Sequence, residues 1–393
     1  MKKLLILAIV LTLALSLVAA PAVAAAEIYV GPGDSIQAAI DAASPGDTII
    51  VAVGTYTEQL TVNKSVTLIS DTGDYRTTGT ILTGAMRIRL TDSAGGAIIQ
   101  GFRFEDITSD VEFVSICVDS ITIKANSFKN IISSGGVIIL SRWGSVNTAI
   151  QDNSFKDITG HAVAMYSGAE DTGWHIIGNK IDGVTGTGNK SGFQLFGLSD
   201  SEISNNEISN CSIYAGMLLD GLENVVIADN IIKDTYRKGI QVANSSNVVI
   251  ENNYITNTNT SQRPDEGAIS IYPTATNIQI VNNTLVGNYQ GFTVRDKPGV
   301  VAPDVHVNFN NIYGNEGFGV GNFAQGGGIL DATNNWWGHA SGPSGEHGRT
   351  NPAGKVVGKG DAVSNNVEWD PWLPQPINLT PHEPVPPGLL HTK

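Results

Sequence analysis

Charged side chains gather in one stretch of a chain that is otherwise poor in charge, since only 15% of its 393 residues are Asp, Glu, Lys or Arg. The set consists of the cations Arg237, Lys238, Arg295 and Lys297 and the acids Asp220, Asp265 and Glu266. A lysine or arginine held deprotonated could remove the proton beside a uronate carboxylate, which is the base step of a β-elimination. The acids could hold Ca²⁺ through oxygen ligands, or two of them could act together in hydrolysis.

Aromatic and amide side chains accompany these charges at regular positions. Short phrases such as "GFQLF", "GIQVA" and "AISIY" alternate between inward and outward residues, which indicates strands. Their outward positions supply the binding candidates Tyr166, Gln194, Phe196, Gln241 and Tyr272. Aromatic rings, amides and charges on one sheet would suit an extended acidic polysaccharide. Ordinary solvated surface is the alternative interpretation.

An internal repeat must position these residues. The phrase "IKANSFKNI" at residues 123–131 returns as "IQDNSFKDI" at residues 150–158 and then in weaker forms. Its asparagine recurs about every 26 residues. The series is Asn126, Asn153, Asn179, Asn206, Asn230, Asn253, Asn283, Asn310 and Asn334. A fixed period of this length indicates a solenoid.

The content of each repeat selects the type of solenoid. Turn-forming residues separate the strand phrases, and no repeat has room for a ten-residue helix. We therefore predict an all-β fold, a single-stranded right-handed parallel β-helix. Asparagines at one place in successive coils, about 4.8 Å apart, would bond to one another in a ladder. We expect the helix to span residues 27–373, with ladder coils at about 99–338.

Both ends carry segments that would cover the terminal coils, as a solenoid requires. The phrase "DSIQAAIDAASPGD" predicts a short amphipathic capping helix with a break at Pro45-Gly46. At about residues 331–373 we predict a tryptophan-rich cap containing Trp336, Trp337, Trp369 and Trp372. A sugar-stacking platform is the alternative role for these rings. The Pro-rich residues 374–393 are expected to form a flexible tail.

The first 26 residues have the pattern of a secretory signal peptide, with Lys2 and Lys3, an apolar run and Ala24–Ala26 before Glu27. A retained membrane anchor is the alternative. The net charge of −14 argues against nucleic acid or anionic lipid as partner. We expect a monomeric secreted, extracellular or periplasmic protein that does not contact the membrane after signal cleavage. The repeat places Cys117 and Cys211 several coils apart, which disfavours a disulfide.

The two ends also resemble known proteins. The phrase "IQAAIDAASPGDTIIVAVGTYTEQLTVNKSVTLIS" resembles the first coils of pectin-lyase-like β-helix repeat proteins, especially NosD-like ones. The phrases "DATNNWWGHASGPSG" and "GDAVSNNVEWDPWL" are similar to the closing motif of secreted surface β-helix proteins. The resemblance implies the fold, but this fold carries lyases, hydrolases, epimerases, esterases and structural proteins. The signatures Gly-His-Gly and Asp-Pro-His-Asp of two such enzyme classes do not occur.

Three functions stay open at this point, in order of preference. The first is a secreted or cell-surface protein that binds extracellular polysaccharide or has a structural role. The second is a polysaccharide lyase or other carbohydrate-active enzyme on acidic glycans, with Ca²⁺ as its conceivable cofactor. The third, implied by the NosD resemblance, is a copper accessory protein. The only methionines after the signal segment are Met86, Met165 and Met217. No Cys or His cluster has the spacing of copper ligands.

Overall fold

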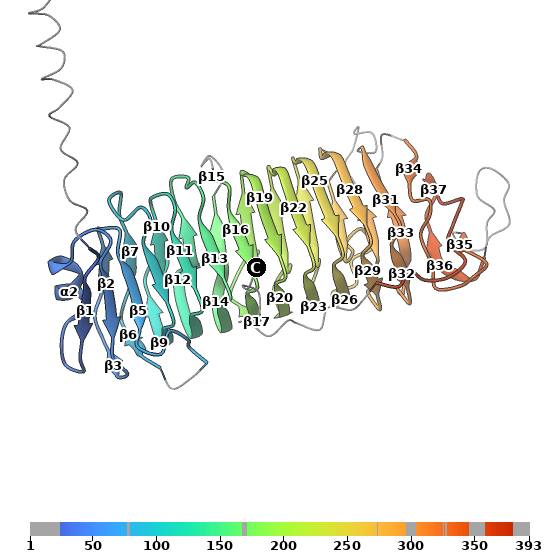
Figure 1. The fold of residues 1–393 in the computed structure, drawn as a ribbon. Coiled ribbons are helices and arrows are strands. Elements are labelled where there is room, and N and C mark those ends of the chain that lie inside the picture. Colours follow the sequence, from blue (N-terminus) through green and yellow to red (C-terminus); the bar gives the residue numbers. More distant parts are fainter. Residues whose placement is uncertain are drawn as a thin grey trace, which may run out of the picture.

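The structure is a computed structural model that describes residues 24–76, 79–166, 171–272, 274–295, 304–324, 326, 328–345 and 358–379. It is a long solenoid whose coils follow the sequence from one end to the other (Figure 1). Residues 1–23 of the predicted signal peptide 1–26, the candidate Lys297 and residues 380–393 of the predicted tail 374–393 lie outside the described residues. No described helix is long and apolar enough to cross a membrane.

Parallel strands form the three faces of the solenoid, here called A, B and C. Face A contains β1 (Glu27–Val30), β2 (Thr48–Val51), β5 (Thr67–Ser70), β8 (Ile98–Gln100), β11 (Thr122–Lys124), β13 (Ala149–Gln151), β16 (His175–Ile177), β19 (Leu198–Ser204), β22 (Glu223–Ala228), β25 (Ser246–Glu251), β28 (Thr276–Val281), β31 (Val305–Asn308), β34 (Leu330–Asp331) and β37 (Val367–Glu368), with β15 (Asp171–Thr172) beside β19.

Faces B and C share two long strands, β12 (Ser127–Ser141) and β14 (Ser154–Met165), which bend from one face to the other. Face B also contains β3 (Thr55–Tyr56), β6 (Ile81–Gly84), β9 (Arg103–Ser109), β17 (Lys180–Thr185), β20 (Glu207–Cys211), β23 (Ile231–Thr235), β26 (Tyr254–Thr258), β29 (Thr284–Val286) and β32 (Asn311–Tyr313). Face C continues through β4 (Leu60–Val62), β7 (Ile88–Leu90), β10 (Val114–Ile116), β18 (Phe193–Phe196), β21 (Met217–Asp220), β24 (Ile240–Ala243), β27 (Ile269–Ile271), β30 (Phe292–Val294), β33 (Phe318–Asn322), β36 (Gly360–Val363) and β35 (Pro343–Gly345).

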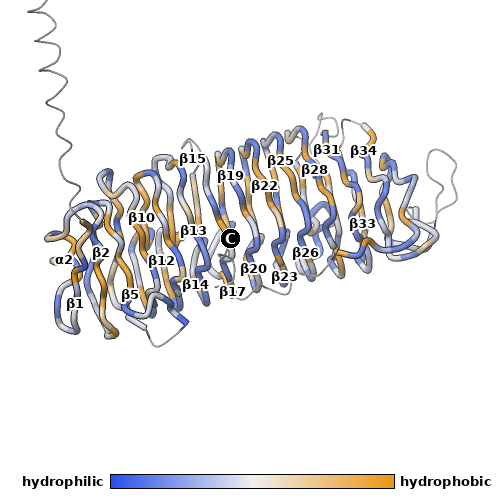
Figure 2. Tube along the Cα trace, in the orientation of Figure 1, coloured by the Kyte–Doolittle hydropathy of each residue, from blue (hydrophilic) through white to orange (hydrophobic). Residues whose placement is uncertain are grey.

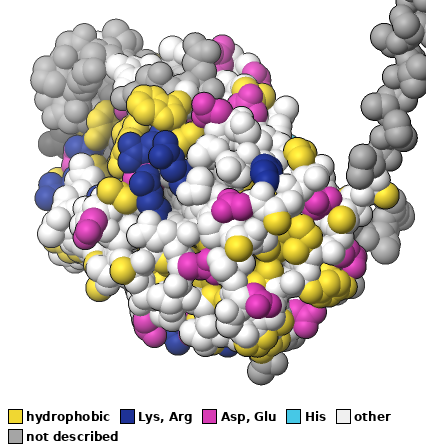
Figure 3. Space-filling model, turned by 90° about the vertical axis from the view of Figure 1, so that its left-hand side faces the viewer, with side chains coloured by type: hydrophobic (Ala, Val, Ile, Leu, Met, Phe, Trp, Pro, Cys, Tyr) yellow, Lys and Arg dark blue, Asp and Glu magenta, His cyan; other side chains and the backbone are white. Residues whose placement is uncertain are grey.

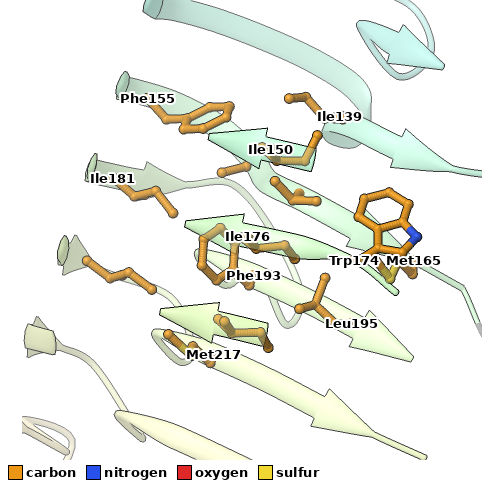
Figure 4. Packing of buried hydrophobic residues seen from close by; sticks show 14 of the residues in the cluster. Ile139, Ile150, Phe155, Met165, Trp174, Ile176, Ile181, Phe193, Leu195 and Met217 are labelled. Carbon is orange, nitrogen blue, oxygen red and sulfur yellow. The ribbon is translucent and has the colours of Figure 1, made fainter. Parts of the chain in front are cut away.

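Alternation of side chains builds the core. Hydrophobic and hydrophilic positions alternate along the strands (Figure 2). Inward residues of successive coils stack on their equivalents, as the rings of Phe128 and Phe155 do with centroids 4.7 Å apart. Ile150 and Ile176 point into the same interior (Figure 4) and are fully buried. The predicted all-β parallel helix is thereby confirmed.

The predicted asparagine ladder runs through the interior. Each amide nitrogen donates to the amide oxygen of the next coil, as Asn179 Nδ2 does to Asn206 Oδ1 at 3.0 Å. The prediction was wrong at the last rung, because Asn310 donates to Asn335 at 3.1 Å and not to Asn334. Asn334 instead has a left-handed backbone, with φ of 58°.

The two ends differ from the interior coils. Helix α2 (Ile36–Ala42) packs against β1, β2 and β4, and Ser35 caps it by accepting from the N–H of Ala38. At the other end Trp337 and Trp369 are buried in the core. Trp336 and Trp372 remain half-buried, so the four tryptophans do not share one role.

Candidate functional site

The register of face C places the candidates in two straight rows, but the first row, predicted to face outward, is buried from Leu218 to Thr293. Gln194 pairs with Leu218, which pairs with Gln241, and the row continues through Ser270 and Thr293. A second row contains Phe196, Asp220 and Ala243, and Tyr272 and Arg295 directly follow the paired residues Ile271 and Val294. Tyr166 stands two residues after Ala164, the partner of Gln194. Consecutive members of a row lie about 4.8 Å apart.

A buried carboxylate organises the cations at one edge of face C. Glu266 is fully buried, and Arg237 donates from Nε to Oε2 at 2.7 Å and from Nη2 to Oε1. Arg295 donates from Nη1 to Glu266 Oε1 at 2.6 Å, and Lys238 Nζ lies 3.2 Å from the same oxygen. Arg295 Nη2 also pairs with Asp265 at 2.7 Å. Three cations, two from the coil before Glu266 and one from the coil after it, therefore converge on one acid.

Burial and charge together set the ionisation of this acid. Burial alone would raise the pKa of Glu266, but the hydrogen bond from Arg237 and the charge of Lys238 outweigh it and lower the pKa to about 2. Glu266 is therefore ionised at neutral pH. Its oxygens are occupied by arginine donors, so this residue does not fit the role of a calcium ligand.

Lys238 lies beneath the arginines and has no exposed surface. Its Nζ donates to the Tyr214 hydroxyl at 3.0 Å and to Gln241 Oε1 at 2.8 Å. Burial lowers the pKa of Lys238 to about 7, against the attraction of Glu266. Part of the Lys238 population is therefore neutral at physiological pH, which a general base requires.

Two tyrosines flank the cations. Arg237 lies over the Tyr214 ring with its guanidinium carbon 4.4 Å from the centroid. Arg295 lies 5.2 Å from the centroid of Tyr272. These are cation–π distances, and they hold the two guanidinium groups against a rigid aromatic surface.

Tyr214 was missed by the sequence reasoning. The signal was present, because Tyr214, Arg237 and Glu266 each stand three residues before the paired positions Met217, Ile240 and Ile269. Aligning that edge position across coils would have placed the tyrosine beside the arginine.

Of the remaining candidates, Phe196 packs against Tyr214, whereas Asp220 is not part of this cluster. Asp220 accepts from Asn244 Nδ2 at 2.8 Å. Within the described residues, no three His, Cys, Asp or Glu side chains lie close enough to share a metal ion. The structure thus does not bring the acids Asp220, Asp265 and Glu266 together as a set of metal ligands. The three methionines named for copper are buried in the core.

A second arginine–carboxylate cluster lies on face C, closer to the N-terminal end of the solenoid. Glu112 is buried and accepts from Arg142 Nε at 2.9 Å and from Arg87 Nη2. Burial raises the pKa of Glu112, but its hydrogen bonds, first that from Arg142, lower it to about 2. Tyr166 directly follows Met165, whose partner Ser141 precedes Arg142, and it is 42% exposed. In the end-on view of Figure 3, Lys and Arg side chains gather beside hydrophobic ones on one flank of the molecule.

The burial of Lys238 predicts a distinctive pH dependence of stability. Between about pH 7 and its ordinary pKa of 10.5, the unfolded chain binds more protons than the folded one. The free energy of unfolding should therefore rise with pH in this window. Urea unfolding at pH 7 and about pH 9 measures the rise. Lys238→Met should lack this component, and an equal rise in wild type and variant would contradict the burial of the lysine.

Comparison with protein families supports the fold. Residues 135–312 match the model described as a right-handed beta helix region, and residues 30–217 match a protein family of unknown function, DUF1565. The resemblance to pectin-lyase-like and NosD-like β-helix repeat proteins is thereby confirmed. No curated protein matches.

Solved structures of the same architecture include carbohydrate-active enzymes. The catalytic domain of an alpha-1,3-glucanase in complex with tetrasaccharides is 14% identical, with a TM-score of 0.56 over 89% of this chain and 65% of that one. An alginate lyase is 14% identical, with a TM-score of 0.52 over 86% of this chain and 93% of that one. A mannuronic acid specific lyase from human gut microbiota is 11% identical, with a TM-score of 0.50 over 78% of this chain and 81% of that one.

Proposed function

We propose that this right-handed parallel β-helix protein is secreted or displayed at the cell surface and binds an acidic polysaccharide along face C. A carbohydrate-related function is supported by the fold and its structural neighbours. The observation that carries the finer proposal is the pair Arg237 and Arg295, both anchored on buried Glu266.

The arginine pair is suited to carboxylates. Each arginine side chain is 17% exposed, so it is held by Glu266 and still partly reaches solvent. A guanidinium offers paired donors that match a carboxylate. Because Glu266 and the tyrosine rings already hold both side chains, binding costs little further ordering. The row that contains Phe196, Tyr272 and Arg295 is partly exposed, repeats every ~4.8 Å and can follow an extended polymer.

A lyase activity is the second candidate, and the lowered pKa of Lys238 favours it. In that reaction the Lys238 amine takes the proton from the carbon beside the uronate carboxylate. The electron pair forms the new carbon–carbon double bond, and the glycosidic oxygen leaves. Arg237 or Arg295 would neutralise the carboxylate. Two structural neighbours are lyases by name. The covering Tyr214 must move for Lys238 to reach a sugar, so binding without chemistry is preferred.

Titration calorimetry with uronic-acid oligosaccharides, and with neutral ones of equal length, tests the proposal. Uronate oligomers should bind, and Arg295→Ala should weaken binding about 10–100-fold, the value of a hydrogen bond to a charged group. Arg103→Ala is the matched control, because Arg103 lies on face B and pairs locally with Glu105. Its affinity should equal that of the wild type.

The same samples separate binding from catalysis. Elimination creates an unsaturated sugar that absorbs ultraviolet light, and its formation can be followed with and without Ca²⁺. A rise in absorbance that is lost in Lys238→Ala would make the protein a lyase. Absence of uronate binding, or equal binding by Arg295→Ala, would refute the proposal for face C.

A further inference from the structure

A separate groove of about 490 Å³ lies on face B near the C-terminal end. Strands β23, β26, β29 and β32 form its floor, and residues 376–379 form one wall. The wall is fixed by Asn311, whose amide donates to the Ile377 carbonyl and accepts from its N–H, both at 2.9 Å. The groove is therefore built by coils and a segment far apart in the sequence.

Aromatic rings line this groove in register with the coils. Tyr254 pairs with Thr284, Thr284 with Asn311 and Asn311 with Trp336, so Tyr254 and Trp336 stand in one row. Three coil steps of about 4.8 Å separate them. Tyr254 is 38% exposed, and Tyr313 lies against Trp336 with ring centroids 5.0 Å apart. Two ring surfaces three coil steps apart suit two non-adjacent units of one extended ligand.

The polar groups of the groove are almost all uncharged. Asn252, Asn282 and Asn378 supply amides along its rim. Among the described residues that line the groove, Asp229 is the one charged side chain. Amides both donate and accept, as sugar hydroxyls do, whereas an anionic chain would find no cation to pair with its carboxylates. The groove thus lacks the cations that Arg237 and Arg295 supply on face C.

We propose that this groove is a second glycan site, distinct from face C, and that it binds a neutral oligosaccharide. Tyr254 stacks on one sugar ring and the Tyr313–Trp336 pair on another. This assignment separates the terminal tryptophans, because Trp337 and Trp369 are buried in the core whereas Trp336 faces the groove. The site does not depend on the binding of acidic glycans elsewhere.

Calorimetric titration with three neutral hexasaccharides, of cellulose, starch and laminarin type, tests the site. At least one should bind, and Tyr254→Ala should weaken it about tenfold, as expected for loss of an aromatic contact. The ring of Tyr254 is exposed, so this variant is expected to fold. Tyr29→Ala is the matched control, because Tyr29 is a 68% exposed tyrosine on β1 at the other end of the solenoid.

Arg295→Ala distinguishes this site from face C. Affinity for the neutral hexasaccharide should be unchanged in that variant, even if its uronate binding is lost. The proposal is overturned if none of the three sugars binds. It is also overturned if Tyr254→Ala binds as tightly as the wild type, or if Tyr29→Ala loses as much affinity.

Discussion

Replacing Glu266 by alanine is expected to lower the free energy of unfolding by about 3–5 kcal/mol, because it leaves buried charges without their partner. Arg237 and Arg295 would lose their shared acceptor, and Lys238 would remain buried between them. Uronate binding should fall as well, since the arginines would no longer be held in place. Urea unfolding measures the stability change, and calorimetry measures the binding.

The control for this substitution is Glu202→Ala. Glu202 faces His175 at 3.8 Å in an exposed pair on face A, and its removal should change stability by less than about 0.5 kcal/mol. If Glu266→Ala were as mild as Glu202→Ala, the carboxylate would not organise the cations. Glu266→Gln keeps the volume and some hydrogen bonds, so a loss intermediate between wild type and alanine is expected.

Replacing Asn206 by alanine should cost about 2–4 kcal/mol, because several buried polar groups lose their partner at once. Asn206 Oδ1 accepts from the backbone N–H and the side chain of Asn179. Its Nδ2 donates to Asn230 Oδ1 and to the Ile176 carbonyl, both within 2.9 Å. No water is expected to replace these bonds inside a packed coil. Thermal or urea unfolding measures the loss.

Asn210 is the matched control in the same coil. It is exposed, and its amide donates to Asp182 at 2.6 Å. Asn210→Ala removes one solvated hydrogen bond and places alanine on a left-handed backbone with φ of 56°, so it should cost about 1 kcal/mol, less than Asn206→Ala. Equal losses at the two positions would show that the interior ladder has no special weight in stability.

The fold could be predicted because each coil repeats the same physical requirements. An inward apolar residue, a buried asparagine and a turn former recur together, so one alignment defines all the coils. The alignment failed where the sequence offered two neighbouring asparagines, Asn334 and Asn335. Only the position of Trp337 in the core, in register with Ile312, decides between them.

The site could be predicted only in part. The sequence placed Arg237, Lys238 and Arg295 near two acids, but it could not show which groups are buried. The ion pairs join residues one coil apart, 29 positions in the case of Arg237 and Glu266. The Glu112 cluster was missed for this reason, since its arginines lie 25 and 30 positions away. Pairing charges at the repeat period would have found both clusters.

The most direct test of the central claim is a crystal structure of the protein with a uronic-acid hexasaccharide. We expect a sugar chain that lies across the strands of face C, with a carboxylate on Arg237 or Arg295 and a sugar ring against Tyr272. A uronate chain bound elsewhere, with both arginines still contacting only Glu266 and Asp265, would contradict it.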